Sequence, residues 1–169
     1  GEKGADLLPK IVEKSIQQTH GRLNVMILGS GEKQIENELK ELNGTYSNFA
    51  LDLGYKEYRS HKIYASSDFL LMPSRVEPCG LNQMYAMRYG SVPIVRYIGG
   101  LRDTVEDIST GGSGINFGDA TAEDAVNAMH RAMHIYHDHE LMKNLIQSNM
   151  DFDFSWDKSA HIYLELYRK

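Results

Sequence analysis

The sequence predicts an α/β protein with a doubly wound parallel sheet and extra helices at its C-terminal end. Two observations support this fold class. Apolar runs of strand length alternate four times with segments whose apolar residues recur at helical spacing, which is typical of parallel strands joined by helices. After Thr110 the alternation stops and helical patterns dominate. The 169 residues, 41% hydrophobic and 24% charged, suffice for one domain with a substantial core.

The first predicted unit is a helix over residues 8–20 followed by a buried strand over residues 23–29. Apolar residues recur at helical spacing in the helix, and Pro9 is tolerated because it lies in the first turn. A glycine-containing turn and a helix with Ile35 and Leu39 on one face come next. Strand, tight turn and helix therefore follow one another directly.

Three more strand–helix units follow along the chain. They cover residues 48–54 and 57–65, residues 68–74 and 80–90, and residues 92–98 and 99–105. Residues 109–119 contain four glycines and predict a loop with a short strand at 115–117. The rest predicts a long helix from Thr121, whose spacing to Asp124 approximates a capping box, a second around residues 141–146 and a third from Ser155.

Composition excludes several classes of partner. A net charge of −5 without a cluster of Lys or Arg argues against binding nucleic acid or an anionic membrane surface. No apolar run approaches the roughly 18 residues of a membrane-spanning helix. Cys79 is the only cysteine, which is typical of a reducing compartment, and the opening residues resemble no signal or transit peptide. The expected location is the cytoplasm, or the plastid in a plant.

Ligands of open parallel sheets bind where strands end and helices begin, so the strand–helix turns are the candidate sites. The first turn, "LGSGEKQ", has Gln34 where a dinucleotide fingerprint needs its third glycine, and a plain tight turn is favoured. The second turn places Gly54 before Tyr55. This aromatic ring either stacks on a base or packs on the next helix, and the residues alone favour packing.

The third turn, "PSRVEPCGLNQ", is the most unusual. Free amides at a helix start suit a phosphate, and Gly80 allows close approach to the backbone. The carboxylate of Glu77 would repel that phosphate, so beside a bound anion it should point elsewhere and accept hydrogen bonds from sugar hydroxyls. Pro78 bars the residue before it from helical geometry and so holds Glu77 outside the helix.

Two other groups of residues have competing interpretations. Cys79 lies where a helix start lowers a thiol pKa, but no histidine partner is obvious, and filling space is favoured over nucleophilic catalysis. His130, His134 and His137 fall on one stripe of a predicted helix. A solvated helix face is favoured over a metal site because no further ligand cluster lies beside them in the sequence. We expect neither a metal nor a cofactor.

Residues 73–105, "PSRVEPCGLNQMYAMRYGSVPIVRYIGGLRDTV", resemble the longest signature of the bacterial and plant glycogen and starch synthases, retaining glycosyltransferases of the GT-B architecture. Similarity extends through "GYKEYRSHKIYASSDFLLMPS" and "MDFDFSWDKSAHIYLELY" to nearly the whole chain. The opening "EKGADLL" is similar to a motif just past the junction of that family's two domains. The resemblance implies that residues 1–169 are one Rossmann-like, donor-nucleotide-binding domain, without the N-terminal acceptor domain.

The resemblance also implies a donor site. Its residues are Lys3, Gly54, Tyr55, Glu77, Cys79, Gly80, Leu81 and Asn82. Lys3 would bind the donor diphosphate, and Gly54 with Tyr55 would hold adenine and ribose, which reverses the packing preference for Tyr55. Glu77 would contact the transferred glucose as the catalytic carboxylate. The amides of Gly80, Leu81 and Asn82 would surround the distal phosphate, Cys79 would line the pocket, and Gln83 would have a supporting role.

The implied reaction transfers glucose from ADP-glucose to the non-reducing end of an α-1,4-glucan with retention and without a metal. The preference for ADP over UDP comes from the resemblance. The glucan would bind the N-terminal domain, so this chain alone should not catalyse transfer. Asn82 replaces the usual Thr and Val76 replaces the usual Phe. These departures bear on the affinity for the donor more than on the class of reaction. The alternatives are another GT-B transferase or phosphorylase, a non-catalytic nucleotide-binding module, and a redox Rossmann domain, which the incomplete glycine fingerprint disfavours.

Overall fold

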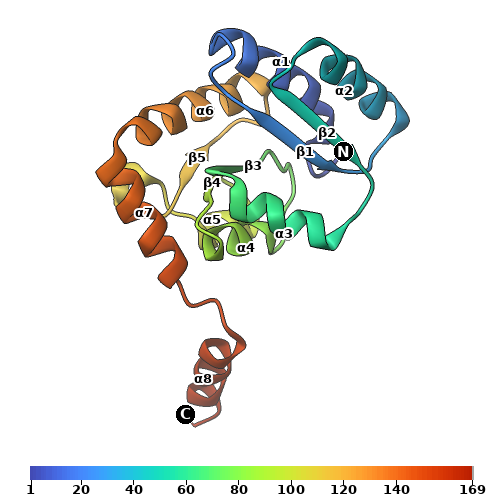
Figure 1. Cartoon of the computed structure of the whole chain (residues 1–169). Helices are drawn as coiled ribbons and strands as arrows, with labels where there is room; N and C mark the ends of the chain where they lie inside the picture. The colour runs from blue at the N-terminus through green and yellow to red at the C-terminus, as the bar shows by residue number, and fades with distance from the viewer. Residues whose placement is uncertain (169) are drawn as a thin grey trace.

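The computed structural model describes residues 1–168 and has the predicted alternation of strands and helices (Figure 1). In chain order its elements are η1 (Ala5–Leu7), α1 (Leu8–Gln18), β1 (Val25–Gly29), α2 (Lys33–Thr45), β2 (Phe49–Leu53), α3 (Glu57–Ser66), β3 (Phe69–Met72), α4 (Asn82–Arg88), β4 (Val92–Arg96), α5 (Gly99–Thr104), η2 (Ile108–Thr110), β5 (Ile115–Phe117), α6 (Ala122–His137), α7 (His139–Asp151) and α8 (Trp156–Tyr167). The α/β fold class is therefore confirmed.

The strands pair in parallel, but they form two ladders where one continuous sheet was expected. β1 pairs with β2, and β3, β4 and β5 pair in that order. Each ladder buries its own apolar cluster. Phe49 of β2 belongs to the cluster formed with α1 and α2, whereas Ile94 of β4 belongs to the cluster formed with α6. The described residues thus form three apolar clusters, one on the two-stranded ladder and one on each face of the three-stranded sheet, where the sequence suggested a single core.

Helices cover both faces of the three-stranded sheet. Val92 and Ile94 of β4 point to the side of α6. Side chains alternate along a strand, so Val95 points to the opposite side, where it packs with Leu101 of α5. All four side chains are at most 2% exposed, and burying one such residue contributes roughly 1.5–3 kcal/mol. The doubly wound arrangement is thus confirmed for β3, β4 and β5.

The two-stranded ladder is covered on one face only. α1 and α2 bury that face through Val12, Ile16 and Leu39. On the other face, Met26 is 47% exposed and Ala50 of β2 is exposed as well. The following helix, α3, contains no buried residue.

The C-terminal helices begin where the capping residues predict. The Thr121 side chain accepts a hydrogen bond from the Asp124 amide at the start of α6, and Ser155 caps α8 in the same way. α8 extends away from the other helices and has no buried residue (Figure 1). Across residues 1–168, every helix is too short or too polar to cross a lipid bilayer.

Candidate functional site

The turn between β3 and α4, residues 73–81, holds Glu77 outside the helix as Pro78 predicts; we call it the Glu77 turn. The helix expected over residues 80–90 is shorter and begins at Asn82. Gly80 causes this difference, because its φ of 72° is a left-handed conformation that does not belong to a right-handed helix. The carboxylate is therefore positioned by the turn and not by α4.

The N-terminal segment of the chain lies against this turn. The Glu2 carbonyl accepts hydrogen bonds from the amides of Arg75 and Val76, at 2.7 and 3.1 Å. The Arg75 guanidinium donates to both carboxylate oxygens of Asp6, at 2.5 and 2.7 Å. This bidentate pair holds the pKa of Asp6 well below its usual range. Lys3 is thereby brought to the Glu77 turn.

Lys3 and Glu77 form an ion pair across 74 residues of sequence. The Lys3 ammonium is 2.6 Å from each carboxylate oxygen of Glu77, and the Ser74 hydroxyl donates to Oε2 at 3.1 Å. Glu77 is only 5% exposed, while the Lys3 side chain is 65% exposed. The carboxylate is thus bonded to Lys3 and Ser74.

Two consecutive glycines at the start of α5, Gly99 and Gly100, pack directly against the backbone of the Glu77 turn. The Gly100 amide donates to the Glu77 carbonyl at 2.8 Å, and a Cβ at Gly100 would clash with the Cys79 carbonyl. Gln83, which is fully buried, donates from Nε2 to the carbonyls of Cys79 and Gly80, at 3.3 and 3.0 Å. The resemblance gave Gln83 a supporting role, but the two glycines were missed at the sequence level, although a pair of glycines before a helix is a signal of close backbone approach.

The amides at the start of α4 are free to bind a ligand. No side chain caps this helix, and within the described residues the amides of Gly80, Leu81 and Asn82, none of them in a buried residue, donate to no protein acceptor. Such amides carry the positive end of the helix dipole. Cys79 and Leu81 are exposed beside them. The Glu77 turn therefore places one ammonium, one buried carboxylate and several free amides together, a combination that suits a phosphorylated sugar.

Gly54 and Tyr55 lie at the end of β2, on the other ladder. Gly54 has a φ of 112°, and its amide donates to the Gly29 carbonyl at 2.9 Å. Tyr55 is 81% exposed, so the interpretation that it packs on the next helix is wrong. Within residues 1–168, no hydrogen bond or ion pair joins either residue to the Glu77 turn.

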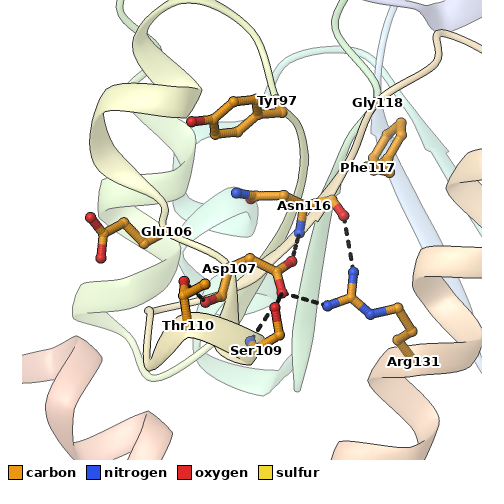
Figure 2. A pocket seen from close by; sticks show the side chains of 9 residues that line it. All are labelled: Tyr97, Glu106, Asp107, Ser109, Thr110, Asn116, Phe117, Gly118 and Arg131. Atoms are coloured by element: carbon orange, nitrogen blue, oxygen red, sulfur yellow. Dashed lines mark hydrogen bonds and ion pairs between the residues drawn. The ribbon is translucent and has the colours of Figure 1, made fainter.

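A hollow of about 1050 Å³ lies beside β5, and none of the predicted site residues lines it (Figure 2). Asp107 is its central side chain. Its carboxylate accepts hydrogen bonds from Arg131 at 2.6 Å and from the Asn116 amide at 2.7 Å, while Arg131 also donates to the Asn116 carbonyl. These bonds satisfy the backbone of the edge strand β5, and the role that they support is structural.

This network changes the pKa of Asp107. Burial acts to raise it, but the hydrogen bonds from Arg131, Asn116 and Ser109 outweigh burial and lower the pKa to about 2. Asp107 is thus ionised at neutral pH.

The histidine stripe on α6 is mostly solvated. His134 and His137 are exposed, and His130 Nε2 is 2.9 Å from Gln18 Oε1. Within residues 1–168, no group of three or more His, Cys, Asp or Glu side chains is arranged to hold a metal ion.

Comparison with known proteins identifies the relatives of this chain. A model of the family described as "Glycosyl transferases group 1" matches residues 1–150. The chain is 46% identical over 167 residues to a glycogen synthase of Flavobacterium johnsoniae, covering 98% of this chain and 35% of that protein. It is 42% identical to a glycogen synthase of Thioalkalivibrio sulfidiphilus, covering 99% and 36%. The chain therefore spans about a third of the length of these relatives.

A solved structure agrees with the sequence relatives. The catalytic domain of starch synthase IV from Arabidopsis thaliana, bound to ADP and acarbose, superposes with a TM-score of 0.82 and 36% identity, covering 99% of this chain and 36% of that one. The resemblance to glycogen and starch synthases predicted from the "EPCGL" signature is thus confirmed. With the family match over residues 1–150, the chain belongs to the glycosyl transferases group 1 family.

Proposed function

We propose that this chain is the C-terminal, donor-binding domain of a glycogen or starch synthase. The enzyme would transfer glucose from ADP-glucose to the non-reducing end of an α-1,4-glucan with retention. The observation that carries this proposal is the ion pair of Lys3 with the buried Glu77, beside the free amides of α4. The glycogen synthases to which the chain is similar are about three times as long, and the additional length would contain the acceptor domain.

Each charge in the site has a role in this reaction. Cleavage of the bond between glucose and diphosphate develops negative charge on the leaving group and positive charge on the sugar. Lys3 and the amides of Gly80, Leu81 and Asn82 would stabilise the leaving diphosphate. Glu77 would accept hydrogen bonds from the glucose hydroxyls and stabilise the positive charge on the sugar. No protein nucleophile is required if the acceptor hydroxyl attacks on the same face, and Cys79 would form a wall of the pocket.

The nucleotide would extend toward Gly54 and Tyr55. The high exposure of the Tyr55 ring leaves its face available for stacking on adenine, and Gly54 lets the backbone approach the ribose. The related starch synthase IV was solved with ADP, which supports an adenine nucleotide in this site. The glucan acceptor, the absence of activity in this chain alone and the cytoplasmic location stay predictions.

Glucose transfer tests the proposal directly. In the full-length polypeptide, Glu77→Gln removes the charge but keeps the shape, and transfer from ADP-glucose to glycogen should fall by about 100-fold or more. Unchanged turnover in Glu77→Gln would remove this residue from the site. Calorimetry with ADP, ADP-glucose, UDP and NAD separates the alternatives: binding of NAD without any response to ADP or ADP-glucose would contradict a synthase and favour a redox domain.

A further inference from the structure

Ser74 is a buried hydroxyl beside the catalytic carboxylate. It is 3% exposed, and its Oγ donates to Glu77 Oε2 at 3.1 Å. Within residues 1–168, Lys3 and Ser74 are the only side chains that hydrogen-bond the Glu77 carboxylate. These two partners hold the same group in very different ways.

Ser74 is fixed to the three-stranded sheet. Arg96, at the end of β4, donates to the carbonyls of Ser74 and Arg75 at 3.3 and 2.9 Å, and also to the Gly118 carbonyl at 3.0 Å. One guanidinium thereby ties the start of the Glu77 turn to the ends of β4 and β5. A short side chain on such an anchored backbone keeps its hydroxyl in one place.

Lys3 is the exposed partner. Its side chain is long and 65% exposed, and it donates to both oxygens of Glu77. An ammonium has three N–H donors, so two of them are used by this carboxylate. In the proposed function a donor diphosphate competes for the same ammonium, and each donor that turns to a phosphate is lost to Glu77. The carboxylate then depends on Ser74.

We infer that Ser74 is a positioning residue that holds the Glu77 carboxylate toward the transferred sugar when Lys3 turns to the donor diphosphate. This inference rests on the proposed function and adds a residue to it. Ser74 contacts neither the sugar nor the phosphate in this scheme. It acts through Glu77, and its loss should slow the chemical step more than it weakens donor binding.

The test compares Ser74→Ala with Ser91→Ala in the full-length polypeptide. Ser91 is a matched control because it is fully buried and its hydroxyl bonds another hydroxyl, that of Ser67, at 3.1 Å, away from the Glu77 turn. Ser74→Ala should lower kcat for glucose transfer about 10-fold, with the KM for ADP-glucose changed by less than about 3-fold. Ser91→Ala should keep kcat, although both variants lower the melting temperature by a similar amount.

Two further variants separate positioning from general damage. Ser74→Thr retains a hydroxyl and should restore most of kcat. In a Glu77→Gln background, Ser74→Ala should change kcat by less than about 2-fold, since the group that it positions is already altered. The inference is overturned if Ser74→Ala keeps kcat, if Ser91→Ala lowers kcat as much, or if a folded Ser74→Thr remains as slow as Ser74→Ala. An unchanged kcat in Glu77→Gln alone contradicts the proposed function instead.

Discussion

The two ends of the proposed donor site are built very differently. At the phosphate and sugar end, Glu77 is buried and bonded to Lys3 and Ser74, and the turn around it is held by Gly100 and Gln83. At the nucleotide end, Tyr55 is 81% exposed and stands on a ladder that is covered on one face only. Charge stabilisation needs groups held in one geometry, whereas stacking on a flat base tolerates a mobile ring.

Dense bonding alone does not define a catalytic site in this molecule. Asp107 has more hydrogen-bond partners than Glu77, yet they are the nearby Ser109, the backbone of β5 and the Arg131 side chain, which also bonds that strand (Figure 2). What distinguishes the Glu77 turn is the group of free amides beside it. The following predictions test this difference, from the largest expected effect to the smallest.

Replacing Gly100 by Ala should disrupt the rigid end most. The added methyl group would clash with the carbonyl of Cys79. This carbonyl belongs to the backbone, so it cannot move aside as the end of a flexible side chain could. We expect Gly100→Ala to lower the free energy of unfolding by about 2–3 kcal/mol and to weaken ADP binding. Chemical denaturation and calorimetry measure the two effects.

Gly44→Ala is the control for that change. Gly44 lies in α2 with open space around its Cα, so alanine should raise the free energy of unfolding by about 0.5–1 kcal/mol. Equal stability of the Gly100→Ala and Gly44→Ala variants would show that Gly100 is not tightly packed against the Glu77 turn.

Asp107→Asn should affect stability and leave transfer unchanged. The pKa of Asp107 is lowered from 3.8 to about 2 in the folded protein, so its contribution is present above about pH 4 and is lost as the pH falls through 2. Because the Arg131 side chain is 43% exposed, we expect a loss of only about 1–2 kcal/mol at pH 7. Denaturation of both proteins at several pH values measures this difference, which should vanish below pH 2; a loss of transfer activity would contradict the structural role.

Lys3→Met should weaken donor binding. Removing the ammonium from the diphosphate should raise the Kd for ADP about 10-fold, or about 1.4 kcal/mol. Lys10→Met is the control, since Lys10 is similarly exposed and pairs with Glu123 at 3.0 Å away from the turn. Calorimetry on both variants decides the matter, and equal ADP affinities in the two would remove Lys3 from the phosphate site.

The difference between the ends also explains what the sequence could predict. Pro78 and Gly80 act on their own neighbours, so the position of Glu77 outside the helix followed from local chemistry. The ion pair with Lys3 spans 74 residues and depends on the backbone bonds of Glu2 to the turn, and periodicity contains no information on such contacts. The split into two ladders was missed for the same reason, because alternation predicts strands but not which of them pair.

The nucleotide end should show the smallest effect, and one limited to binding. Tyr55→Ala should raise the Kd for ADP about 5-fold, or about 1 kcal/mol, and Tyr55→Phe should retain affinity because the ring does the stacking. Tyr58 is the matched control: it is 72% exposed on the first turn of α3, and its ring lies against Lys62. Calorimetry with ADP and with pyrophosphate separates the ends, because Tyr55→Ala should weaken only ADP binding whereas Lys3→Met should weaken both. If Tyr55→Ala and Tyr58→Ala bind ADP with equal affinity, adenine does not stack on Tyr55, and the nucleotide end of the donor site lies elsewhere on the molecule.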